Sequence, residues 1–275
     1  MEAGAVSTGS PIPLNAFTDP PSPESRVGIG IPLPLLLMTP LETEAIALSR
    51  GLSTFTGSLR PQKFGDRPDF PRMPVSIAFI GPGNPEGKGF SRKAAEIGYR
   101  SVCLVGFAAG LSSGMDSGTV RVLSRFFREN SPPLFAKGAE TWSQCLGLDL
   151  GNGVTVDRIV SHPGEKKRLN ERTLADMADM ESYPWFLEFR DAEVTVAVIR
   201  VVSDGADTSL PPVVSRFVNV DGRQNLFGGI PGLVRDPGAL VALVNALPGL
   251  LKGRAAMTEL GRRFGRLVSG EAVHR

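Results

Sequence analysis

The stretch TVAVIRVVSDGAD, residues 195–207, decides the fold. Its first nine residues are mainly apolar and β-branched, which is typical of a strand buried on both faces of a parallel sheet. The strand ends in Ser203 and Asp204, at the sheet edge where α/β proteins bind ligands. Burial there raises the pKa of a carboxyl group and suits a general acid. The alternative is that Asp204 caps the next turn.

Strands and helices alternate on the N-terminal side of this stretch. The expected strands are 35–38, 75–81, 101–106, 118–126 and 153–160. The expected helices are 41–52 (with Gly51 near its end), 87–99 and 164–175. The alternation predicts an α/β fold with a mostly parallel sheet.

The two ends of the chain differ from this middle part. Residues 1–30 are rich in Pro, Ser, Gly and Ala and predict a disordered arm, so that 31–275 form a single domain. At the other end, helices are expected within 235–268. Asp236 is the predicted N-cap, and Pro248 is predicted to break the first helix before a second at 250–267.

Composition and charge exclude several classes of protein. A hydrophobic content of 41% and a charged content of 21% are ordinary for a globular chain. The net charge of +2 and the absence of a basic–aromatic ladder argue against a nucleic-acid partner. The apolar run 28–39 is too short to span a membrane and lacks the flanks of a signal peptide. We therefore expect a cytoplasmic enzyme.

Neither a metal site nor a dinucleotide site is expected. Cys103 and Cys145 lack metal-ligand spacing, and the two histidines, His162 and His274, cannot complete a cluster with them. The segment GPGNPEG (81–87) places its third glycine one residue too late for a dinucleotide fingerprint. It predicts a Gly-Pro turn instead.

Three further features lie near predicted strand ends. Glu44 follows the first strand, and the segment FAAGLSSG (107–114) follows the third. The small residues of this turn either present backbone N–H groups to a ligand or allow close helix packing. In ADMESYPW (178–185), Glu181 either begins a solvated helix or binds a hydroxylated ligand from inside a pocket.

These pieces together resemble one known family. The chain contains, in order, ETEA (42–45), VGFAAGL (105–111), EKKRL (165–169), ADMES (178–182) and VVSDGAD (201–207). This order resembles the nucleoside phosphorylase and nucleosidase superfamily, which includes the methylthioadenosine/adenosylhomocysteine nucleosidases. The resemblance covers roughly residues 35–210. Its most specific part is DMES followed about twenty residues later by a strand ending in SD.

The resemblance implies a three-layer αβα fold and cleavage of the N-glycosidic bond of a purine nucleoside. Asp204 is expected to protonate the purine ring, and Glu44 to orient the attacking water. Glu181 is expected to bind the ribose hydroxyls. Further substrate contacts are implied for Met180, Ala108, Ala109, Gly110 and Ser203. No cofactor is implied, and inorganic phosphate would serve as co-substrate only in a phosphorylase.

Several positions depart from the family pattern. Leu104 stands where some phosphorylases carry an arginine, which favours water over phosphate as nucleophile, although Lys88 or Arg92 could replace that arginine. Ala109 stands where a glycine is usual. Three bulky residues follow DMES and are expected to narrow the pocket: Tyr183, Pro184 and Trp185. A non-catalytic nucleoside-binding protein on the same fold is the alternative to an enzyme.

The C-terminal segment carries a second, narrower resemblance. Residues 221–251 are similar to the tail of the hopanoid-associated phosphorylases, which are thought to remove adenine from adenosylhopane. The family also implies a homodimer. The C-terminal helices are amphipathic and basic, so they either cover a sheet edge or make a peripheral membrane contact.

Overall fold

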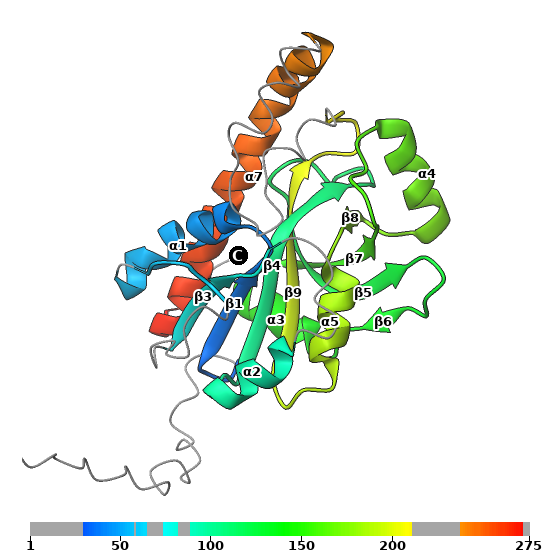
Figure 1. The fold of residues 1–275 in the computed structure, drawn as a ribbon. Coiled ribbons are helices and arrows are strands. Elements are labelled where there is room, and N and C mark those ends of the chain that lie inside the picture. Colours follow the sequence, from blue (N-terminus) through cyan, green and yellow to red (C-terminus); the bar gives the residue numbers. More distant parts are fainter. Residues whose placement is uncertain (1–29, 58, 65–73, 82–88, 211–236, 272–275) are drawn as a thin grey trace, which may run out of the picture.

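The computed structural model describes residues 30–57, 59–64, 74–81, 89–210 and 237–271. Three sequence predictions lie outside these ranges: the N-terminal arm, the turn after Gly81 together with Lys88, and most of the hopanoid-like segment, including Asp236. Figure 1 shows the described helices packed around a central sheet.

The described strands form a single nine-stranded sheet. Its order is β2-β3-β1-β4-β8-β7-β5-β6, and β9 pairs with both β4 and β5. The strands are β1 Leu35–Thr39, β2 Gln62–Lys63, β3 Val75–Phe79, β4 Ser101–Gly110, β5 Val120–Arg128, β6 Leu134–Phe135, β7 Asp149–Thr155, β8 Met177–Asp179 and β9 Thr195–Asp204. The short strands β2, β6 and β8 were not predicted from the sequence.

The sheet is mostly parallel, and part of it closes on itself. The parallel pairs are β1–β3, β1–β4, β2–β3, β4–β9, β5–β7 and β7–β8. Antiparallel pairs join β4 to β8, β5 to β6 and β5 to β9. The pairings therefore run in a circuit through β4, β9, β5, β7 and β8. The mixed α/β fold with a large, mainly parallel sheet confirms the predicted fold class.

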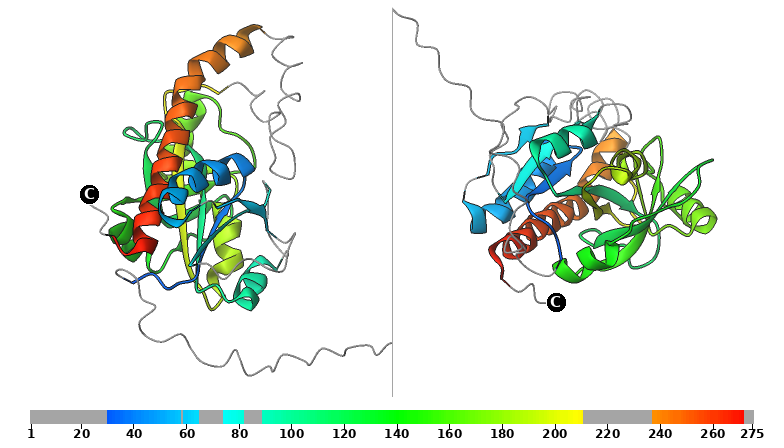
Figure 2. Two further views of the ribbon diagram at one scale, coloured as in Figure 1. Left: turned by 90° about the vertical axis from the view of Figure 1, so that its left-hand side faces the viewer. Right: turned by 90° about the horizontal axis from the view of Figure 1, so that it is seen from below.

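The helices cover this sheet. They are α1 Glu42–Thr56, α2 Phe90–Ile97, α3 Ala139–Leu146, α4 Pro163–Thr173, α5 Ser182–Arg190 and α7 Pro237–Ser269. α5 packs against β9, β7 and β5, whereas α3 packs against β5, β7 and α7. α7 runs beside α1 and lies against β9, and its first turns project beyond the sheet (Figures 1 and 2). Of the helices in the described ranges, none is sufficiently long and apolar to cross a bilayer.

Strand β4 is longer than predicted. The sequence places a small-residue turn after Gly106, but the strand continues to Gly110. It is extended because β9 runs parallel beside it as far as Asp204, while β8 pairs with its last two residues. The predicted turn residues are thus the end of a central strand.

Strand β7 begins earlier than predicted and ends at Thr155. Two glycines hide its start in the sequence, since glycine is usually unfavourable in a strand. Here each makes room for a side chain of β5. An added Cβ on Gly153 would lie 2.6 Å from Leu123 Cδ1, and one on Gly151 would lie 3.1 Å from Arg121 Cβ.

The prediction that Pro248 breaks the C-terminal helix is wrong. α7 continues through Pro248 as a single helix. Proline removes one backbone N–H and so leaves one carbonyl of the preceding turn without its donor. Pro248 and Val244 are both exposed, so water can bond the Val244 carbonyl at little cost.

Candidate active site

Glu44 links helix α1 to the end of strand β4. It lies in the first turn of α1, where its Oε2 accepts the Leu41 N–H over 2.8 Å and so helps to cap the helix. Its Oε1 accepts the Phe107 N–H over 2.7 Å. The side chain is buried, with only 2% of the residue exposed. The predicted water-orienting residue is therefore fixed at both carboxylate oxygens.

Burial raises the pKa of Glu44 to about 7. The two backbone hydrogen bonds, from Phe107 and Leu41, and the positive charge of Arg200 lower it, whereas the charge of Glu181 raises it. The charges of both Arg200 and Glu181 thus act on Glu44. A carboxyl group with a pKa near neutrality can accept a proton from water and release it again.

Arg200 is a buried residue next to Glu181 that the sequence does not point to. It lies in the middle of β9 and is 1% exposed. Its Nε donates to Asp179 Oδ2 over 3.0 Å and to Ser182 Oγ over 2.8 Å. Its Nη2 lies 4.0 Å from Glu181 Oε2. A charged residue inside the most apolar strand was the signal that could have revealed it.

A glycine on the neighbouring strand β4 makes room for this guanidinium group. Gly106 pairs with Arg200 in the β4–β9 ladder, and an added Cβ there would lie 2.0 Å from Arg200 Nη1. Among the described residues, Nη1 has no hydrogen-bond partner although it is buried. Nη1 therefore keeps its N–H donors without a described acceptor, next to Gly106 of β4.

Asp179 holds the segment that carries Glu181. Its Oδ1 accepts the backbone N–H groups of Glu181 and Ser182 over 3.0 and 2.8 Å and the Thr155 hydroxyl over 3.1 Å. Its Oδ2 accepts from Arg200 and from the Ser182 hydroxyl. Asp179 thus has a structural role, and Glu181 follows it at the start of α5, buried and within reach of Arg200.

The bulky residues after Glu181 pack α5 onto its neighbours. The Trp185 ring stacks on Phe90 of α2 with centroids 5.1 Å apart. The Tyr183 hydroxyl donates to the Pro132 carbonyl over 2.8 Å. Tyr183, Pro184 and Trp185 are all buried. These contacts account for their size, and an effect on the pocket stays a prediction.

Asp204 ends β9 and is buried beside a cation. Its side chain is 3% exposed, and the Lys166 side chain, from α4, is fully buried. Lys166 Nζ lies 2.5 Å from Asp204 Oδ2, and the Ser203 hydroxyl donates to Oδ1 over 2.6 Å. Burial raises the pKa of Asp204, while the charge and hydrogen bond of Lys166 and the Ser203 hydrogen bond lower it. Lys166 belongs to the EKKRL motif, but two adjacent lysines do not indicate which is buried.

The end of β4 lies between these groups. Ala109 pairs with Asp204 on β9 and with Ala178 on β8, after a bulge that follows Ala108. The Ser203 hydroxyl also lies 3.3 Å from the Ala108 carbonyl. Gly110 is explained by packing, because an added Cβ would lie 2.2 Å from the Met115 carbonyl.

The contacts of several predicted site residues lie along the second half of β4. Glu44 accepts a hydrogen bond from the backbone of β4. Ser203 and Asp204 end the neighbouring strand β9, and Glu181 follows β8, which pairs with the last residues of β4. Met180 is half-buried between β8 and Glu181. Arg92 is not part of this group of contacts; it lies exposed on α2, 3.5 Å from Glu96. Within the described ranges, no group of three or more His, Cys, Asp or Glu side chains could hold a metal ion.

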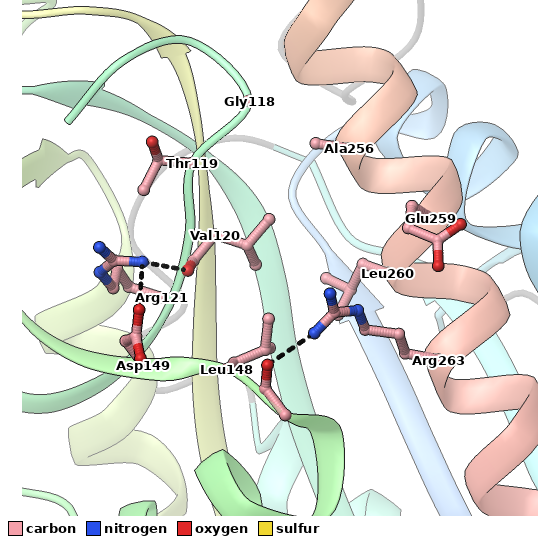
Figure 3. Close-up of a pocket in the computed structure, with 11 residues that line it drawn as sticks. Gly118, Thr119, Val120, Arg121, Leu148, Asp149, Ala256, Glu259, Leu260 and Arg263 are labelled. Carbon is pink, nitrogen blue, oxygen red and sulfur yellow. Dashed lines mark hydrogen bonds and ion pairs between the residues drawn. The ribbon is translucent and has the colours of Figure 1, made fainter. Parts of the chain in front are cut away.

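A separate cavity of about 390 Å³ lies between α7 and the starts of β5 and β7 (Figure 3). None of the predicted site residues lines it. Its charged side chains are engaged by the protein: Arg263 donates to the Leu146 and Gly147 carbonyls, and Arg121 lies 3.2 Å from Asp149. We therefore place the candidate active site at the end of β4 and not in this cavity.

Solved structures with this architecture point to one fold. The nucleosidase for 5'-methylthioadenosine from Arabidopsis thaliana matches with a TM-score of 0.56 and 12% identity, over 85% of this chain and 93% of that one. Futalosine hydrolase of Helicobacter pylori matches with a TM-score of 0.55 and 12% identity, over 85% and 96%. The chain has the nucleosidase fold.

A third structure with the nucleosidase fold was solved with a ligand. It is the 5'-methylthioadenosine/S-adenosylhomocysteine nucleosidase of Helicobacter pylori with butyl-thio-DADMe-Immucillin-A. It matches with a TM-score of 0.54 and 13% identity, over 82% of this chain and 94% of that one. No protein-family model and no curated protein sequence matches the chain. At this level of identity the likeness concerns the nucleosidase fold.

Proposed function

We propose that the protein hydrolyses the N-glycosidic bond of a purine nucleoside and releases an adenine-type base. The observation that supports this proposal is that Glu44 bonds β4, Asp204 pairs with Ala109 near its end, and Glu181 follows the strand β8 that pairs there, within a nucleosidase fold. Three buried carboxyl groups with different partners provide a base, a site for sugar hydroxyls and an acid.

The proposed reaction uses each group once. The bond between the sugar and the base breaks, and its electron pair stays with the base. The proton on Asp204 passes to a ring nitrogen, so the base leaves neutral. Water forms the new bond to the sugar carbon and gives its proton to the Glu44 carboxylate. Solvent exchange then moves a proton from Glu44 to Asp204, which restores both groups.

Glu181 and Arg200 act on the sugar and the water. As the bond breaks, the sugar gains positive charge, which a nearby carboxylate stabilises. Glu181 accepts hydrogen bonds from the ribose hydroxyls, and Met180 packs against the ribose. Arg200 acts on the charge of Glu44, and its buried Nη1 has no described partner, so we propose that it donates to the oxygen of the attacking water.

Hydrolysis is favoured over phosphorolysis by the surroundings of β4. Leu104 is 3% exposed within the core, where an arginine would be needed to bind phosphate. Arg92, the described candidate to replace it, is exposed and close to Glu96. No cofactor takes part in the proposed reaction. If the protein is a phosphorylase, inorganic phosphate is its co-substrate.

The test is base release from a series of adenine nucleosides, with and without phosphate. We expect adenine to appear in phosphate-free buffer. We also expect Asp204→Asn, which cannot donate the proton, to lower kcat by at least about 10²-fold while the fold is kept. Release that requires phosphate would replace the hydrolase by a phosphorylase. Binding without release, by wild type and variant alike, would point to a non-catalytic nucleoside-binding protein.

The wider setting of the reaction is also a proposal. The similarity of residues 221–251 to hopanoid-associated phosphorylases suggests adenosylhopane as substrate, in a cytoplasmic homodimer. A lipid substrate would be reached from a membrane surface, and exposed apolar residues on α7 support a peripheral contact there. Adenosylhopane belongs in the release assay, and sedimentation velocity would report the oligomer.

A further inference from the structure

Helix α4 carries a lysine into the interior of the protein. The Lys166 side chain has no exposed surface. Its Nζ lies 2.5 Å from Asp204 Oδ2, 2.7 Å from the Gly205 carbonyl and 2.9 Å from the Thr208 carbonyl. A further carbonyl, that of Asp204 itself, lies at 3.5 Å. Lys166 therefore joins α4 to both the end of β9 and the turn after it.

The geometry fits an ammonium group and not a neutral amine. An ammonium has three N–H donors, and three acceptors lie within 3 Å of Nζ. A buried charge is costly unless it is paired and fully hydrogen-bonded, and both conditions are met here. The next residue, Lys167, is different: its side chain is 78% exposed, 3.9 Å from Glu171.

The ammonium makes the two oxygens of Asp204 unequal. Because an N–H of Lys166 points at Oδ2, a proton on that oxygen would face the ammonium. Oδ1 instead faces the Ser203 hydroxyl, 2.6 Å away. That hydroxyl carries one proton and also lies 3.3 Å from the Ala108 carbonyl. It can donate to Oδ1 when Asp204 is ionised, or donate to Ala108 and accept from Oδ1 when Asp204 is protonated.

We propose that Lys166 is the positioning residue of Asp204: its ammonium holds Oδ2, so that the catalytic proton is carried and released at Oδ1. This inference rests on the proposed function, since it assigns Lys166 a part in the same proton transfer. When the proton leaves Oδ1 for the base, the resulting carboxylate already has its counter-ion. The ammonium does not have to move into place during the proton transfer. Charges fixed in this way lower the barrier because they need no reorganisation.

The charges around Asp204 make this pair testable by pH. From α4 the group facing Asp204 is Lys166, and from β9 it is the Ser203 hydroxyl. Asp116, in the segment before β5, lies beside the next residue, since its Oδ1 would be 3.8 Å from a Cβ on Gly205. Removal of the ammonium leaves only the Ser203 hydrogen bond to oppose the effect of burial on the pKa of Asp204. Asp204 would then keep its proton to higher pH.

The experiment compares Lys166→Met with Lys167→Met on the same helix. We expect Lys166→Met to lower kcat by about 10²-fold, to change KM little, and to move the alkaline limb of the kcat profile to higher pH. Lys167→Met should match the wild type in all three. If folded Lys166→Met keeps the wild-type kcat and the alkaline limb does not move, the inference is wrong.

A second measurement does not depend on catalysis, and it tests the inference even if Lys166→Met does not fold. Carboxyl-¹³C NMR of the wild type should show Asp204 titrating without any matching loss of the slowly exchanging Lys166 ammonium signal. In Lys166→Gln, a milder change, the Asp204 titration should move upward. A wild type that releases no base refutes the proposed function alone. An Asp204 titration unchanged by Lys166→Gln, or no protected ammonium signal, refutes the role of Lys166.

Discussion

The carboxyl group of Glu44 is buried, so its contribution to the free energy of unfolding depends on pH. Its pKa is raised from an ordinary value of 4.5 to about 7 by burial. Between these two values the folded protein binds more protons than the unfolded chain. The free energy of unfolding therefore falls as pH rises through this window, by about 3 kcal/mol for this group, and levels off above pH 7.

The variant Glu44→Gln should remove this slope. It is neutral at every pH, so its stability should fall less than that of the wild type between pH 5 and pH 8, by the same few kcal/mol. Urea unfolding at both pH values measures the difference. Glu42→Gln, in the same helical turn, is the control and should keep the wild-type slope. If the free energy of unfolding changes equally with pH in the wild type and in Glu44→Gln, Glu44 is ionised throughout this range.

The same ionisation should appear in the activity. The kcat/KM of the wild type should rise through about pH 7, because Glu44 becomes able to accept a proton there.

The sequence indicated the acidic residues of the site but not their cations. Glu44, Glu181 and Asp204 could be named because they occupy motif positions near predicted strand ends. Arg200 and Lys166 could not, since the pattern of apolar residues says which faces are buried and not which charges pair across elements. Arg200 interrupts an apolar strand and could have been noticed. Lys166 lies in a polar helix segment whose two lysines look equivalent until the structure shows that only the first is buried.

At the scale of elements, the crossing of α1 and α7 depends on glycines. An added Cβ on Gly51 of α1 would lie 1.8 Å from the Thr258 carbonyl, and one on Gly261 of α7 would lie 2.1 Å from the Leu48 carbonyl. The two backbones touch directly, as they do where small residues line a helix contact. The sequence predicts a helix end near Gly51, because glycine is a common helix terminator. The helix instead passes through it and ends at Thr56.

This contact predicts an unusual response to alanine. In an exposed helix, Gly→Ala stabilises by up to about 1 kcal/mol. Gly51→Ala should instead destabilise the protein by about 2 kcal/mol or more, because the new methyl group forces the helices apart. The control is Gly164→Ala in α4, where the nearest atom to an added Cβ is Arg168 Nη1 at 3.6 Å. Thermal unfolding should place Gly51→Ala below the wild type and Gly164→Ala at or above it. Equal stability of the two variants would contradict direct backbone contact.

At the scale of the whole molecule, α7 has two different halves. Its second half is part of the core through Met257, Leu260 and Phe264, which are at most 1% exposed. Its first half projects beyond the sheet (Figures 1 and 2) and exposes large apolar side chains. The exposed fractions are 61% for Val241, 59% for Val244, 47% for Leu247 and 57% for Leu251. Deleting α7 would therefore unfold the protein, and a test of this apolar stripe must use substitutions.

For the proposed peripheral contact, the charge of this stripe favours an anionic membrane. Residues 237–256 contain no acidic residue, and their two basic residues, Lys252 and Arg254, are both exposed. A basic residue near an anionic bilayer contributes about 1 kcal/mol, so Lys252→Gln with Arg254→Gln should weaken binding to anionic vesicles about 30-fold. Vesicles of neutral lipid should bind the wild type weakly. Co-sedimentation measures both.

The apolar half of the contact is tested by Val241→Ser, Val244→Ser and Leu251→Ser together. These side chains are exposed, so the fold should be kept, while binding to anionic vesicles should fall below detection because little apolar area remains to insert. Leu187→Ser, on α5 and 37% exposed, is the control for loss of an exposed leucine elsewhere. If the triple variant sediments with vesicles as well as the wild type does, the stripe is not a membrane contact. A triple variant that instead changes from dimer to monomer in sedimentation velocity would make the stripe an interface between two copies of the chain.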